Sequence, residues 1–166
     1  FGSLKFVRCV YDKGLLNNGV HLLDYLKTLL GPEIEVRWVG DPVFDSSPNN
    51  PTLSLNLKIN SIPIFIAGND SRNYSLFEVK FFFETATFEL KDSGRQLIHE
   101  QTTKHRLYRD YTILEQLNER PTDLINSLDA MYQSILSKSC ISNFQEAIST
   151  EQFCSQIIES FMEPRN

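Results

Sequence analysis

The segment from Lys13 to Asp24, KGLLNNGVHLLD, gathers the residues of this chain that are best suited to chemistry. An Asn-rich turn precedes an apolar stretch of helical period, and His21 stands in the first turn of the helix that this stretch predicts. Asn17 or Asn18 can cap that helix, and its first backbone N–H groups favour an anion or a sugar hydroxyl oxygen. The same partial positive charge favours a neutral imidazole at His21, which can accept a proton from an alcohol as a hydride leaves.

A structural interpretation of the same segment stays open. Asn-Asn-Gly is ordinary turn and cap chemistry, and His21 can simply bond Tyr25 or Asp24 one turn along the helix. Lys13 can meet a substrate carboxylate or phosphate as a compact point charge, or it can be a solvated turn lysine. Composition alone favours the structural interpretation over the catalytic one.

Other signatures of catalysis and binding do not occur in the sequence. The patterns GxGxxG, P-loop, HExxH and GxSxG are missing, so the chain carries no nucleotide-binding or hydrolytic motif of its own. The three histidines have no carboxylate or thiol partners at metal-ligand spacing, which argues against a metal site. The net charge of −5 argues against nucleic acid as a partner, and no apolar run reaches the roughly 20 residues that span a membrane. Three widely spaced cysteines fit reduced thiols and a cytoplasmic location.

The elements that position the His21 segment follow from hydrophobic periodicity. Residues 4–11 predict a strand with Leu4, Phe6 and Val10 as its apolar positions, and Val20 to Leu30 predicts an amphipathic helix that stops at Gly31. Alternation and turn residues predict later strands at 34–39, 53–59, 62–67, 76–83, 87–90 and 95–101. The basic and aromatic stretch 104–111 can fold back over a sugar or nucleotide, because aromatic residues and Arg suit such ligands, but a solvated connection between the sheet and the helices that follow is the favoured interpretation.

Beyond about His105 the period becomes helical. Apolar residues at 124, 128, 131 and 135 predict one helix, and Ser149 with Gln152 predicts a capping box, stapled by Ile148 and Phe153, at the start of the last one. Strands joined by short turns pair antiparallel. The predicted fold is therefore an α+β domain of two layers, with a mostly antiparallel, open-faced β-sheet, arranged as a meander, and helices packed on one face. The other face is either wet or covered by a second copy.

The run NNGVHLLDYLKTLLG, preceded by a strand and Lys-Gly and followed by IEVRWVG, resembles the start of the C-terminal domain of the Gfo/Idh/MocA family of NAD(P)-dependent sugar dehydrogenases. In that family a strand leads into a G-x-H-x-x-D helix that ends in Leu-Gly, and an antiparallel sheet and late helices follow. The resemblance covers the order of elements over nearly the whole chain. The G-V-H-L-L-D helix and its flanks are its sequence-specific part.

The resemblance implies that residues 1–166 form a single C-terminal-type domain of a two-domain enzyme. The implied N-terminal Rossmann domain is absent from this chain; it would precede Phe1, bind most of the NAD or NADP and contribute a Glu-Lys-Pro lysine. This chain would bind a sugar or nucleotide-sugar substrate, and its sheet would form a homo-oligomer. The isolated chain is then expected to be inactive, because a hydride acceptor must be held close to the carbinol carbon.

The resemblance also assigns roles to individual residues. His21 matches the catalytic acid/base histidine. Asn17 stands where the family often has Asp, so it can orient the substrate or His21 but cannot become a carboxylate. Lys13, Asn18 and Asp24 complete the predicted substrate-binding set, and a structural role for Asp24 is at least as well supported. The alternative function is a non-catalytic sheet module for self-association or partner binding, which Asn17 in place of Asp favours slightly.

Overall fold

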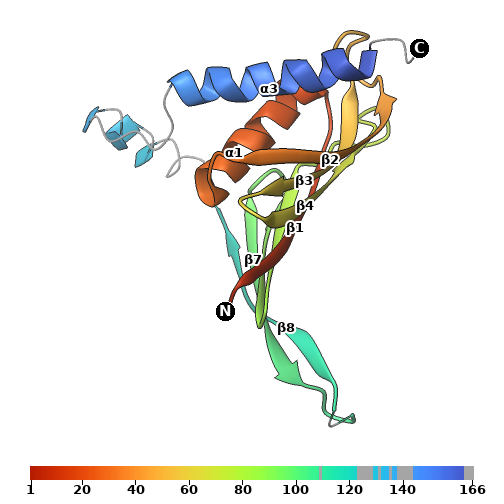
Figure 1. Cartoon of the computed structure of the whole chain (residues 1–166). Coiled ribbons are helices and arrows are strands. Elements are labelled where there is room, and N and C mark those ends of the chain that lie inside the picture. Colours follow the sequence, from red (N-terminus) through yellow and green to blue (C-terminus); the bar gives the residue numbers. More distant parts are fainter. Residues whose placement is uncertain (109, 123–128, 131, 135, 138–143, 163–166) are drawn as a thin grey trace.

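Strands dominate the part of the chain that the computed structural model describes, which is residues 1–108, 110–122, 129–130, 132–134, 136–137 and 144–162. Within these residues one open sheet of eight strands carries helices on one face (Figure 1). The strands are β1 (Leu4–Tyr11), β2 (Ile34–Val43), β3 (Thr52–Ile59), β4 (Ile62–Gly68), β5 (Glu78–Phe83), β6 (Ala86–Lys91), β7 (Gln96–Lys104) and β8 (Thr112–Pro121). The helical elements are η1 (Leu15–Gly19), a π-helical turn, α1 (Val20–Leu30) and α3 (Phe144–Met162). None of these described helices is long and apolar enough to cross a membrane.

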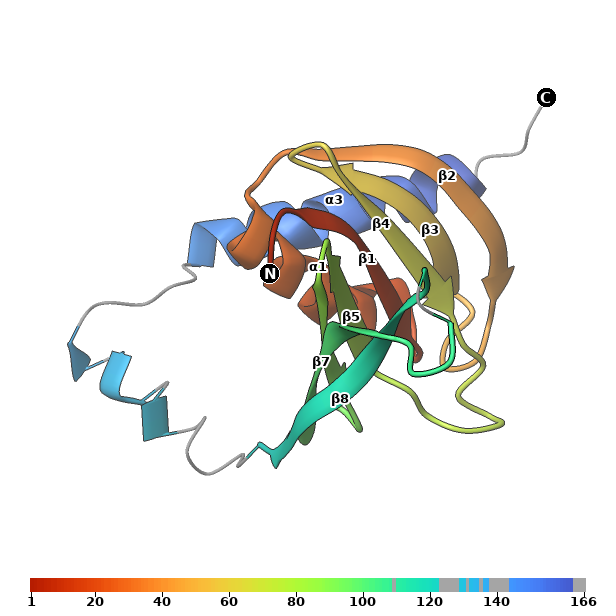
Figure 2. The ribbon, with the colours of Figure 1, turned by 90° about the horizontal axis from the view of Figure 1, so that it is seen from below.

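The strand order is β2-β3-β4-β1-β5-β6-β7-β8, and the sheet curves around the helices (Figure 2). The prediction of a mostly antiparallel, open-faced sheet in an α+β domain is confirmed. The prediction of a simple meander is wrong, because β1 lies between β4 and β5 and pairs with β4 in parallel. The chain reaches β4 from β1 through α1, β2 and β3, and a connection of this length permits parallel pairing.

The helices α1 and α3 pack against the same face of the sheet. Leu22, Leu23 and Leu26 of α1 share one core with residues of α3 and of four strands. Its other buried members include Val7, Cys9 and Tyr11 of β1, Leu53, Leu55, Leu57 and Ile59 of β3, Ile64 and Ile66 of β4, Val79 and Phe81 of β5, and Cys154, Ile157 and Ile158 of α3. This core fixes the position of α1, which carries His21.

The buried face of β1 differs from the predicted one. Val7, Cys9 and Tyr11 are buried, whereas Phe6 and Val10 are only half-buried on the other face. Leu4 packs against the core, because the register with β5 shifts between Leu4 and Phe6. Both faces of β1 carry apolar side chains, so the two-residue period did not distinguish them. The leucines of α1 decide which face is covered.

β2 and β7 extend beyond the predicted strands, and β8 was not predicted as a strand. β2 continues to Val43, because it keeps pairing with β3 past two irregularities in register. β8 lies where a helical period was predicted, and it pairs with β7 to form an arm that projects from the body (Figure 1). The stretch 104–111 is exposed over most of its described length, but it joins two strands rather than the sheet and a helix.

The last helix begins earlier than predicted. α3 starts at Phe144, so Ser149 lies inside it and the predicted capping box and staple are wrong. Ile157 lies on its buried side, with Cys154 and Ile158 beside it. The predicted helix positions 124, 128, 131 and 135 lie outside the described residues.

Candidate active site

A π-helical turn connects β1 to α1. The N–H of Gly19 donates to the carbonyl of Gly14 at 3.2 Å, the five-residue spacing that defines this turn. Gly14 has φ 89°, and a Cβ there would lie 2.6 Å from the backbone oxygen of Asn50. The helix Val20–Leu30 is confirmed at both ends, but Gly19 precedes it in helical conformation without a side-chain cap, so the predicted cap at Asn17 or Asn18 is wrong.

The first N–H groups of η1 already have acceptors. The N–H of Leu15 donates to the carbonyl of Pro51 at 3.0 Å, and the N–H of Leu16 donates to Oδ1 of Asn50 at 2.8 Å. A dinucleotide pyrophosphate is bound by open N–H groups at such a strand–helix junction. This junction therefore does not fit the phosphates of NAD or NADP, and the predicted open helix start is not formed.

Asn18 holds η1 against a buried carboxylate. Its Nδ2 donates to Oδ1 of Asp12 at 3.0 Å, and Oδ2 of Asp12 accepts the N–H of Leu76 at 2.8 Å. Asp12 is fully buried. These contacts tie the π-helical turn to the connection between β4 and β5, so Asn18 positions the backbone ahead of His21, and substrate binding by its amide stays a prediction.

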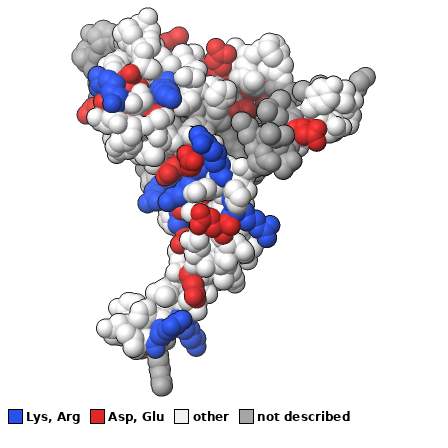
Figure 3. All heavy atoms as spheres, turned by 180° about the vertical axis from the view of Figure 1, so that it is seen from behind, with Lys and Arg blue, Asp and Glu red and all other residues white. Residues whose placement is uncertain are grey.

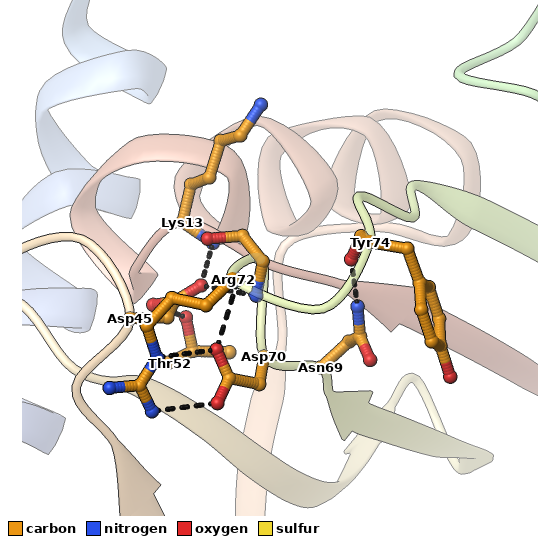
Figure 4. A network of polar contacts seen from close by, with 8 residues as sticks. Lys13, Asp45, Thr52, Asn69, Asp70, Arg72 and Tyr74 are labelled. Carbon is orange, nitrogen blue, oxygen red and sulfur yellow. Dashed lines mark hydrogen bonds and ion pairs between the residues drawn. The ribbon is translucent and has the colours of Figure 1, made fainter.

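Asp45 fixes the turn that contains Lys13 (Figure 4). Its Oδ2 accepts the N–H of Lys13 at 2.9 Å and the N–H of Ser71 at 3.1 Å, and its Oδ1 accepts the hydroxyl of Thr52 at 2.8 Å. Burial alone would raise the pKa of Asp45, but the hydrogen bonds from Lys13, Ser71 and Thr52 together lower it. The Lys13 side chain is exposed and points away from this network, so only its backbone takes part in it.

His21 and Asp24 lie in the wall of a groove of about 340 Å³ between the beginnings of α1 and α3. The groove is lined by Leu16, Val20, His21, Asp24, Phe144, Ala147, Ile148 and Glu151. His21 is exposed and Asp24 is half-buried. The buried hydroxyl of Thr150 donates a hydrogen bond to Oδ1 of Asp24 at 3.4 Å and accepts one from Nζ of Lys27 at 2.8 Å. α3 therefore helps to hold Asp24 in place.

The structure brings two of the five predicted site residues together. His21 and Asp24 share the groove wall, whereas the described lining does not include Lys13, Asn17 or Asn18. Asn17 is exposed, one turn before His21. Among the described residues, no three His, Cys, Asp or Glu side chains converge as a metal site would require.

The opposite wall of the groove comes from α3, which sequence reasoning did not connect with His21. Phe144, Ile148 and Glu151 stand more than a hundred positions away in the chain. The helical period predicted that this helix is amphipathic, but it carried no signal for which helix would lie beside it.

Comparison with solved structures extends over almost the entire chain. UDP-N-acetylglucosamine 3-dehydrogenase GnnA from Acidithiobacillus ferrooxidans is 14% identical, with a TM-score of 0.67 over 98% of this chain and 57% of that one. The super-repressor mutant of Gal80p from Saccharomyces cerevisiae is 10% identical, with a TM-score of 0.64 over 97% and 56%. KijD10, a 3-ketoreductase from Actinomadura kijaniata in complex with NADP and TDP-benzene, is 12% identical, with a TM-score of 0.59 over 96% and 53%. No family model and no curated protein matches the sequence.

GnnA is named as a dehydrogenase, KijD10 as a ketoreductase and Gal80p as a super-repressor mutant, and this chain spans a little over half of the length of each. The chain has the fold of the part of each neighbour that it covers. The predicted resemblance is confirmed at the level of fold. At 10–14% identity the likeness carries no assignment of substrate or of catalytic residues.

Proposed function

We propose that this chain is the substrate-binding and oligomerisation domain of an NAD(P)-dependent oxidoreductase that acts on a sugar or nucleotide-sugar alcohol. The observation that carries the proposal is the exposed His21 beside Asp24 in the wall of a groove with apolar residues around it. Largely apolar clefts with a few convergent polar groups are typical ligand sites. GnnA is named as a sugar-nucleotide dehydrogenase and KijD10 as a ketoreductase, which supports this class of substrate.

In the proposed reaction, His21 accepts the proton of the substrate hydroxyl that is oxidised, and returns it in the reverse direction. Asp24 accepts hydrogen bonds from neighbouring hydroxyls and orients the ring, because an ionised carboxylate is an acceptor only. A nicotinamide cofactor, when bound, would supply the acceptor for the hydride. Since the η1 junction does not fit the cofactor phosphates, a separate domain would hold NAD or NADP. The buried, reduced thiols of Cys9 and Cys154 are compatible with a cytoplasmic enzyme.

The test of this mechanism is turnover by the longest protein that contains this chain. We expect His21→Ala to reduce NAD(P)-dependent oxidation of sugar alcohols by a factor of about 100 or more, because it removes the proton acceptor. His105→Ala is the matched control, since His105 lies at the end of the projecting arm. Unchanged turnover in His21→Ala would remove this residue from the mechanism.

Self-association through the open face of the sheet belongs to the same proposal. Trp38 and Phe65, which are 56% and 45% exposed, border a shallow depression of about 330 Å³ on this face. Phe6 stacks on Phe82 nearby, with ring centroids 4.3 Å apart. Exposed aromatic clusters of this kind are typical of protein interfaces. On the side of the molecule shown in Figure 3, cationic and anionic side chains are interspersed over the body, which with the net charge of −5 favours a protein partner over nucleic acid.

Light scattering after size-exclusion chromatography tests the oligomeric state. We expect a dimer or larger oligomer, and Phe65→Glu should convert it to a monomer because a charge would be buried at the interface. Tyr74→Glu is the control, since Tyr74 is 62% exposed in the connection between β4 and β5. A monomeric parent protein would contradict the proposed interface.

The second candidate function is a non-catalytic module with the same fold. Two observations favour it: Asn17 cannot supply the carboxylate that the family often places one turn before His21, and one neighbour of the same fold is named as a repressor. The substitution Asn17→Asp discriminates the two functions. For an enzyme we expect turnover to be altered together with its pH profile, whereas a non-catalytic module would remain without turnover.

A further inference from the structure

The groove between α1 and α3 has a one-sided charge. Asp24 and Glu151 face it from opposite helices, His21 is the other titratable group of the described lining, and that lining contains no Lys or Arg. Lys27 lies behind the wall, where its Nζ donates to the hydroxyl of Thr150 at 2.8 Å. Of the described residues that line it, the groove therefore presents two carboxylates and no Lys or Arg to a ligand.

The remaining lining is apolar. Leu16 and Val20 come from the η1–α1 side, and Phe144 and Ile148 come from α3; Phe144 is 81% exposed at the start of its helix. A sugar ring has an apolar face of C–H groups and a rim of hydroxyls. The apolar side chains can pack against the ring face while the carboxylates accept hydrogen bonds from the hydroxyls.

We propose that this groove binds an unphosphorylated sugar ring, prefers one that carries a protonated amine, and rejects phosphate, with Glu151 as the residue that determines this preference. The proposal rests on the proposed function, because it takes the groove beside His21 as the substrate site. Two charges about 4 Å apart in water interact by about 1 kcal/mol, which is roughly a fivefold change in affinity for each pair. If the substrate is a nucleotide sugar, its phosphates lie outside the groove.

Binding of glucosamine, glucose and glucose 6-phosphate to the 166-residue chain tests this preference without any cofactor. The readout is the chemical shift of the His21 imidazole in NMR titrations. We expect affinity to fall in that order, with glucosamine and glucose 6-phosphate differing by about tenfold or more. The difference should shrink at high salt, because an open groove is screened.

The variant Glu151→Gln should reduce the ratio of the affinities for glucosamine and glucose 6-phosphate by about fivefold, and Glu151→Lys should reverse the order of the two affinities. Glu159→Gln, two turns further along α3 and exposed, is the matched control and should change neither. Tighter binding of glucose 6-phosphate than of glucose, an unchanged ratio in Glu151→Gln, or no binding of any of the three sugars would overturn the proposal. Turnover that survives His21→Ala while this order of affinities holds would instead refute the proposed mechanism alone.

Discussion

The substitution Tyr11→Phe removes one hydroxyl from the end of the core sheet. That hydroxyl is fully buried, donates to the carbonyl of Leu53 at 3.0 Å and accepts the N–H of Leu53 at 2.8 Å. The hydrogen-bonded ladder between β3 and β4 ends at the pair Leu55 and Ile66. Beyond that pair, the Tyr11 hydroxyl replaces β4 as the hydrogen-bond partner of the β3 backbone. Burial raises the pKa of Tyr11, and the backbone of Leu53 therefore contacts a neutral hydroxyl.

We expect Tyr11→Phe to lower the free energy of unfolding by about 3 kcal/mol. Phenylalanine fills the same ring volume, so the loss comes from one N–H and one C=O left buried without a partner, at about 1–3 kcal/mol each. Urea unfolding followed by circular dichroism measures this loss as a lower midpoint with an unchanged slope.

The matched control is Tyr25→Phe. Tyr25 is half-buried on α1, and its hydroxyl bonds none of the described residues, so we expect a loss below about 0.5 kcal/mol. If Tyr11→Phe costs no more than the control, the two hydrogen bonds to Leu53 do not stabilise the end of the sheet and the reasoning is refuted.

Substitutions at three further positions test the polar and thiol groups in the fold. Lys80→Met should cost about 2–3 kcal/mol near neutral pH, because Nζ of Lys80 lies 3.2 Å from Glu89 and 2.6 Å from Glu100 and all three side chains are largely buried. The hydrogen bond from Lys80 lowers the pKa of Glu100, so this stabilisation is present above the ordinary glutamate pKa and lost as the pH falls; a cost that stays constant in acid would contradict it. Burial raises the pKa of Cys154 from 9.0 to about 12, so the thiol ionises first in the unfolded state and the free energy of unfolding should decline above about pH 9. Because Cys154→Ala removes this thiol, the decline between about pH 9 and about pH 11, measured by urea unfolding, should be about 2.5 kcal/mol smaller in the variant. Asp12→Ala leaves two donors without their buried acceptor and should cost about 3 kcal/mol, whereas Asp12→Asn, which retains one acceptor, should cost clearly less. Equal losses would contradict this, because they would mean that the retained acceptor contributes nothing and that the charged carboxylate, which both variants lose, accounts for the cost.

The sequence was sufficient where local rules and burial agreed. The helix Val20–Leu30 follows from leucines at helical spacing and from Gly31, which has φ 104° at its end. The hairpin between β3 and β4 follows from alternation on both sides of Asn60 and Ser61, which both have positive φ. At these positions the local conformational preference and the tertiary core require the same structure.

The sequence was insufficient where long-range contacts decide. Every residue of β8 is exposed, so this strand has no buried face to create a two-residue period. The parallel pairing of β1 with β4 depends on which strands meet after the helix, and no local pattern records it. The π-helical turn at Leu15–Gly19 resembles an ordinary cap in sequence, because Asn-Asn-Gly suits both.

The candidate site likewise contains residues that the sequence predicted and residues whose position depends on long-range packing. His21 was identified from its place in G-V-H-L-L-D, and Asp24 lies on the same helix one turn later, so both reach the groove together. Asn18 is instead bonded to Asp12, a contact that depends on how η1 packs against the strands. The position of Glu151 in the groove depends on the packing of α3 beside α1, which no local sequence pattern predicts.

The amino-acid sequence encoded immediately before Phe1 is the measurement that tests the central claim most directly. If this chain is the substrate domain of an NAD(P)-dependent oxidoreductase, the preceding residues should contain a strand followed by GxGxxG at the start of a helix, and then a Glu-Lys-Pro motif. An upstream domain of any other kind, or a protein that starts at this domain, would contradict the claim and favour the non-catalytic module.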